Sequence, residues 1–108
     1  MITKDEINAT YGLLQMAIRS YATAQEAYLI AKYDLDRKIN RAIADSMIAG
    51  KNEAERSGNI DYLFGEELDR LYKLKLAVDQ AKYDKEWYSL EAERVQTLIK
   101  LAEILKVE

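Results

Sequence analysis

The chain has 108 residues, of which 49% are apolar and 32% charged, and its formal net charge is −3. This length predicts one domain, and the apolar fraction excludes a disordered tail. The sequence contains no histidine and no cysteine, which excludes disulfides, thiolate metal sites and catalytic pairs built on either residue.

The first predicted helix runs from about residue 3 to residue 49, and no proline interrupts it. It begins at a capping box, Thr3-Lys4-Asp5-Glu6. Apolar residues then recur seven apart at one heptad position, with alanines at a flanking position. The heptad set is Ile7, Leu14, Tyr21, Tyr28, Leu35, Ala42 and Ala49, and the flanking set is Ala17, Ala24 and Ala31. Only a long helix packed along another long helix keeps such a pattern in register.

Gly50 is the predicted end of this helix, because glycine adopts the left-handed conformation that follows many helices. Asn52 then caps a second helical segment over about residues 52–64. We expect an interruption of this segment at Ser57-Gly58-Asn59, which is a turn-type cluster. The alternative is one continuous second helix with a local kink.

The last predicted helix runs from about residue 66 to residue 106 and carries a second apolar ladder, at steps of three and four. Its members are Leu71, Leu74, Val78, Ala81, Tyr88, Ala92, Val95, Ile99 and Ala102. The short link between the long helices predicts that they are antiparallel neighbours. The fold is therefore predicted to be all-α, either an elongated antiparallel helical hairpin or a three-helix coiled-coil bundle, with a single helical domain over residues 1–108.

The apolar face near the end of the last helix is wider than one partner helix requires. Leu98, Leu101 and Leu105 lie beside the main ladder rather than on it. This face either meets the region of Ile2 and Ile7 or forms a subunit interface.

Two kinds of side chain suit the binding of a partner or an anion. There are eight tyrosines and one phenylalanine, and tyrosine is enriched at interfaces. Basic residues near the turn end of the first helix and the start of the last would lie at similar heights in a hairpin. The candidate partner or anion surface comprises Arg37, Lys38, Arg41, Arg70, Lys73, Tyr33, Tyr72 and Tyr83. In the ordinary alternative, the tyrosines only shield the helix flanks, and nearby carboxylates dilute the positive charge. These carboxylates are Asp34, Asp36, Asp45, Glu66 and Glu67.

The sequence offers no chemistry for catalysis. It has no glycine-rich phosphate loop, and paired carboxylates in helical bundles hold metals together with histidines, which this chain lacks. We therefore predict no catalytic residues, no metal, no cofactor and no enzymatic activity.

The segment Ile48-Ala49-Gly50-Lys51-Asn52-Glu53-Ala54-Glu55-Arg56 resembles a turn motif in small coiled-coil accessory proteins of phages and prophages. In those proteins a long charged helix ends at a Gly-Lys-Asn turn, and a second helix opens with Glu-Arg. The chain departs from that pattern at Ser57-Gly58-Asn59, where the second helix usually continues. The resemblance implies a small phage accessory protein that acts inside a bacterium, and it transfers no functional residues beyond the turn.

The leading functional hypothesis is a non-enzymatic phage-type protein that binds and inhibits a host factor, such as a defence or CRISPR component. Three alternatives stay open: an oligomeric binder of a small anionic nucleotide ligand, an accessory to phage DNA recombination, and a purely structural coiled-coil assembly protein. The expected partners are a host protein and further copies of this chain.

Charge and hydropathy set the expected surroundings of the chain. The charges of both signs are interspersed, so direct binding to nucleic acid or to an acidic membrane surface is not expected. No apolar stretch is long enough to span a bilayer, and the first residues lack a signal pattern. We therefore expect a cytoplasmic location in the bacterial host cell.

Overall fold

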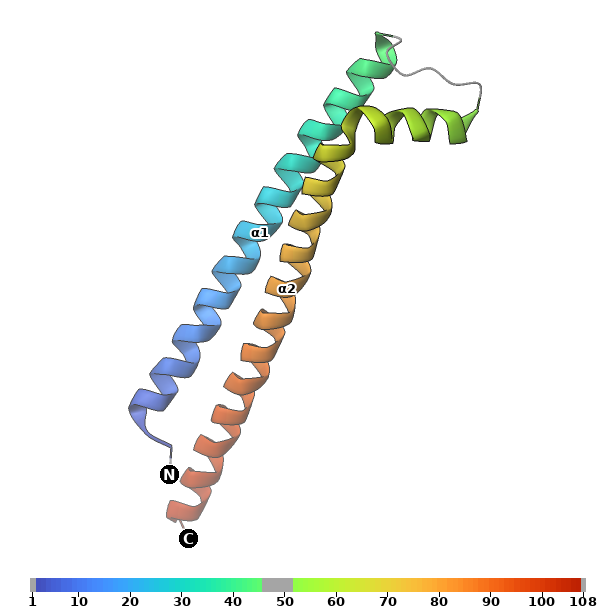
Figure 1. The fold of residues 1–108 in the computed structure, drawn as a ribbon. Helices are drawn as coiled ribbons and strands as arrows, with labels where there is room; N and C mark the ends of the chain where they lie inside the picture. The colour runs from blue at the N-terminus through green and yellow to red at the C-terminus, as the bar shows by residue number, and fades with distance from the viewer. Residues whose placement is uncertain (1, 46–51, 108) are drawn as a thin grey trace. The chain divides into compact units, whose positions relative to one another are not determined.

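The computed structural model describes residues 2–45 and 52–107, which form two helices (Figure 1). Helix α1 spans Lys4–Ala44 and helix α2 spans Glu53–Val107. No strand occurs in these two ranges, which confirms the predicted all-α class. The predicted end of the first helix near Ala49 and the turn at Gly50 lie outside the described residues.

The chain divides into two compact units. Unit 1 consists of Met1–Thr23 and Asp79–Glu108, and unit 2 consists of Ala24–Val78. Within each unit a stretch of α1 pairs with a stretch of α2 that runs in the opposite direction (Figure 1). This antiparallel pairing of two consecutive helices is the predicted helical hairpin.

Side-chain caps fix where both helices begin. The Glu6 amide donates to Thr3 Oγ1 at 3.1 Å, and the Thr3 amide donates to Glu6 Oε2 at 3.4 Å. At the start of α2 the Glu55 amide donates to Asn52 Oδ1 at 2.9 Å. These bonds satisfy amides that have no partner within the first turn of a helix, so both predicted N-caps are confirmed.

The core of each unit is built from the two apolar ladders. The buried apolar side chains in unit 1 are Ala17, Ala92 and Val95, and those in unit 2 are Leu35, Ala42 and Val78. All six belong to the predicted ladders or to the flanking alanine set, and most other members of these sets are half-buried. Ala102 is the exception among the described members, because it is exposed. The heptad pattern therefore predicted which residues form the seam, the line of apolar side chains packed between the two helices. It did not predict that burial along this seam ends before Ala102.

Helix α2 contains one break, at Phe64, whose φ of −121° and ψ of 21° are not helical. Within unit 2, Figure 1 shows α2 changing direction at this break. We call residues 53–63 the arm; apart from the half-buried Ile60, its side chains are exposed. The break lies beside Gly65, next to the predicted start of the last helix.

The expected interruption at Ser57-Gly58-Asn59 is wrong, because the helix continues through these three residues. A glycine inside a helix costs about 1 kcal/mol relative to alanine, which is less than the loss of several backbone hydrogen bonds. The described residues of α2 therefore form one helix with a single kink, and that kink at Phe64 lies where the predicted short segment and the predicted last helix meet.

Candidate functional site

The eight candidate residues are divided between the two units. Tyr83 belongs to unit 1, and the other seven belong to unit 2. All eight are exposed at the helix surface. Tyr83 thus belongs to a different unit from the basic residues with which the sequence grouped it.

In unit 2 the two helices enclose a hollow of about 300 Å³ that brings together Lys38 of α1 and Arg70 of α2. Asp34 and Glu67 line the same hollow, so two cationic side chains meet two anionic ones. Lys38 follows Ala31 by seven residues, and Glu67 precedes Leu74 by seven. Charged side chains therefore occupy seam positions here, and the hollow has no net positive charge to hold an anion.

The remaining cations do not converge on this hollow. The guanidinium carbon of Arg37 lies 5.7 Å from the centroid of the Tyr33 ring, one helical turn away on α1. Neither Arg37 nor Arg41 lines the hollow, and Lys73 does not line it either. Lys38 and Arg70 are thus the candidate cations that line this hollow.

In unit 1 three large side chains follow one another along the exposed side of α2. Tyr83, Trp87 and Leu90 are 64%, 54% and 61% exposed. Their steps of four and three residues place them on one face of the helix. We call these three residues the outer stripe. Sequence reasoning selected only Tyr83; the same helical spacing links Trp87 and Leu90 to it.

Unit 1 also contains a groove of about 1270 Å³, which we call the end groove. Its large apolar lining residues are Ile2, Ile7, Leu98, Ile99, Leu101 and Leu105. The wide apolar face predicted near the end of α2 thus lines the same groove as Ile2 and Ile7. Leu101 nevertheless stays 50% exposed, so the groove leaves the face uncovered.

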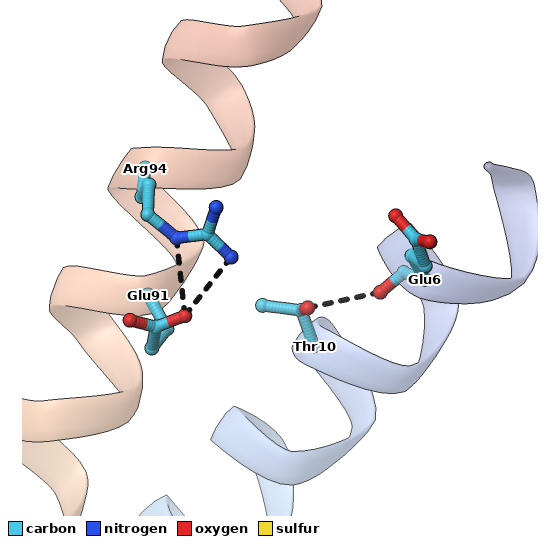
Figure 2. Close-up of polar contacts among 4 residues, drawn as sticks. All are labelled: Glu6, Thr10, Glu91 and Arg94. Carbon is cyan, nitrogen blue, oxygen red and sulfur yellow. Dashed lines mark hydrogen bonds and ion pairs between the residues drawn. The ribbon is translucent and has the colours of Figure 1, made fainter. Parts of the chain in front are cut away.

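Two residues that line the end groove, Arg94 and Glu6, take part in hydrogen bonds within their own helices (Figure 2). Arg94 Nε donates to Glu91 Oε2 at 3.2 Å, and its Nη2 lies 3.2 Å from the same oxygen. On α1 the Thr10 hydroxyl donates to the Glu6 carbonyl oxygen at 2.9 Å. Arg94 and Glu6 both line the groove, together with Glu103 and Lys106.

No group of three or more acidic side chains in the described ranges is arranged to hold a metal ion. Neither described helix has a segment that is both long and apolar enough to cross a membrane. In the comparisons with known proteins, no family model, no curated protein and no solved structure matches this chain.

Proposed function

We propose that this chain is a non-enzymatic protein-binding hairpin that docks a bacterial host protein through the outer stripe and thereby inhibits it. The observation that carries the proposal is the exposure of Tyr83, Trp87 and Leu90 on one helix face. Large apolar side chains grouped on a surface mark interaction sites more often than single exposed ones do. Tryptophan and tyrosine are also the residues that most often dominate binding energy.

The size of the stripe fits an anchor within a larger interface. The exposed parts of these three side chains amount to about 300 Å² of apolar surface, worth roughly 7 kcal/mol when buried. Association itself costs several kcal/mol in lost freedom of motion, so neighbouring contacts must contribute to a stable complex. Lys82 and Glu86, both exposed, flank the stripe and give it the polar rim typical of such interfaces.

Binding of a small anion or a nucleotide has weaker support. The hollow that contains Lys38 and Arg70 also contains Asp34 and Glu67. An anion there would meet two carboxylates as well as two cations, and its attraction to the site would largely cancel. The choice of a host protein as the target, such as a defence or CRISPR component, rests on the resemblance of residues 48–56 to phage accessory proteins.

A capture experiment tests this proposal. The native chain, a Trp87→Glu variant and a Tyr62→Glu variant are immobilised and exposed to bacterial lysate, and retained proteins are identified by mass spectrometry. Tyr62 is 87% exposed but lies on the arm, so its variant is the control. We expect a host protein that is retained by the native chain and by Tyr62→Glu and lost with Trp87→Glu.

Affinity and activity measurements on the captured protein complete the test. With purified components, Trp87→Ala should weaken binding by about 30-fold or more, the effect of losing a dominant aromatic contact. An equimolar amount of the native chain should reduce the activity of the captured protein. Equal retention by Trp87→Glu and the native chain would contradict the binding surface, and undiminished activity would contradict inhibition.

A further inference from the structure

The last described turns of α2 carry apolar side chains that unit 1 does not cover. All side chains of residues 100–106 are exposed, including those of Leu101, Ile104 and Leu105. Ala102 is exposed as well, although it continues the ladder whose earlier members are buried or half-buried. The pattern that specifies helix packing therefore extends beyond the part of α2 that α1 covers.

The end groove and this uncovered face share residues and so belong to the same surface. Ile2 and Ile7 provide one side of the groove, and Leu98, Leu101 and Leu105 provide the other. Side chains at steps of three and four residues also form a ridge of the kind that packs into a groove on another helix. Unit 1 thus presents both a ridge and a groove, which is the condition for two identical surfaces to pair about a twofold axis.

The charges that border the groove favour a copy of the same surface over an anionic partner. Glu6 and Glu103 carry negative charge, and Arg94 and Lys106 carry positive charge. This border is neutral in sum, so a second copy meets acidic and basic groups in equal number. A nucleic acid or an acidic lipid surface would require a net positive border.

The exposed area of the chain leaves room for such an interface. The chain exposes 8708 Å², whereas a monomeric protein of 12.5 kDa typically exposes about 6,200 Å². The excess is about 2,500 Å², and a standard stable interface buries about 800 Å² on each partner. This excess belongs to the chain as a whole, and the exposed leucines of the end groove, Leu98, Leu101 and Leu105, supply an apolar part of it.

We infer that two copies of this chain pair through the end groove, with Leu98, Leu101 and Leu105 of each copy entering the groove of the other. The pairing buries the apolar side chains that end α2 and gives exposed Ala102 the cover that its heptad position predicts. The outer stripe is a separate set of residues, so the dimer does not depend on the proposed function.

The solution mass of matched variants tests the inference. Leu101→Glu places a charge in the groove, and Leu90→Glu makes the same substitution at a similarly exposed leucine of α2 that does not line it. We expect the native chain and Leu90→Glu to have twice the 12.5 kDa mass of one chain, and Leu101→Glu to have the mass of one chain. Helical circular dichroism confirms that each variant is folded.

Cross-linking keeps the inference testable if Leu101→Glu does not fold. The chain contains no cysteine, so Leu101→Cys and Leu90→Cys each introduce a single thiol. With a short bis-maleimide linker, we expect linked dimers from Leu101→Cys at several times the yield of Leu90→Cys. A native mass of one chain, an assembly unchanged by Leu101→Glu, or equal linkage at both cysteines would overturn the inference.

Discussion

The ammonium nitrogen of Lys85 lies 4.7 Å from the centroid of the Tyr21 ring, which joins α2 to α1 within unit 1. The predicted ladder passes from Ala81 to Tyr88, and Lys85 occupies the position between them. Its side chain is half-buried. A lysine suits this position between the helices for two reasons. Its ammonium group faces the electron-rich surface of the Tyr21 ring, and its aliphatic carbons are apolar like the neighbouring side chains.

This contact predicts a measurable coupling between Tyr21 and Lys85. We make the variants Tyr21→Leu, Lys85→Met and the double variant. We expect the double variant to lose about 0.5–1 kcal/mol less stability than the sum of the two single losses, and this difference is the coupling energy of the pair. Unfolding in urea provides the four free energies. The pair Tyr28 and Lys75, at 5.8 Å and with an exposed lysine, is the control and should couple less strongly. Additive effects at Tyr21 and Lys85 would show that the contact does not stabilise the fold.

The seam predicts that Val95 is the position most sensitive to truncation. Val95 is 1% exposed, so Val95→Ala removes two buried methyl groups and leaves a cavity. We expect a loss of about 2 kcal/mol in the free energy of unfolding, seen as a lower urea midpoint with an unchanged slope. Leu90→Ala, at an exposed position of the same helix, should change stability by less than about 0.5 kcal/mol. Similar losses at both positions would contradict the assignment of the seam.

The capping box predicts a loss of stability when the Thr3 hydroxyl is removed. Thr3→Ala deletes the acceptor of the Glu6 amide and should cost about 1 kcal/mol in the free energy of unfolding. Thr3→Ser retains the hydroxyl and should stay close to the native value. Thermal unfolding followed by circular dichroism distinguishes the two. If serine were as destabilising as alanine, the hydrogen bond would not be the source of the effect.

The arm predicts uneven amide exchange along α2. Its side chains are exposed except for half-buried Ile60, so few apolar contacts resist local opening. We expect amides of residues 57–63 to exchange at low opening free energies, whereas amides around Val78 and Val95 require nearly global unfolding. Hydrogen exchange resolved by NMR measures both. Equal protection of the two regions would mean that the arm packs against something more than the described contacts.

The sequence predicted the elements of the fold that depend on local chemistry or on a strict period. Residue type and spacing identified Thr3 and Asn52 as N-caps. The periodic apolar pattern identified Leu35 and Val95 as buried. The error at Gly58 arose because a weak helix former inside a helix is less costly than an interruption. Helix propensity alone does not decide whether a continuous helix that contains Gly58 or a helix interrupted there has the lower free energy.

The sequence predicted the candidate surface less well than the fold, because such a surface depends on which residues of the two helices lie close together in space. The basic residues were expected to lie at similar heights, and Lys38 and Arg70 do share one hollow. Arg37 instead lies against Tyr33 on its own helix. The carboxylates beside Lys38 and Arg70 were anticipated as a dilution of charge, but their position within the same hollow comes from helix pairing. Exposure likewise separates Trp87 from the seam, although its neighbour Tyr88 belongs to it.

The non-helical backbone at Phe64 has a consequence for how α2 tolerates insertions and deletions. In an unbroken helix, one added residue rotates everything beyond it by about 100°, which would turn Leu71 and Val78 out of the seam. A joint at Phe64 absorbs that rotation, because the residues before it do not fix the phase of those after it. An insertion or deletion in the arm thus leaves Leu71 and Val78 in the seam, whereas one between Leu71 and Val78 turns one of them out of it.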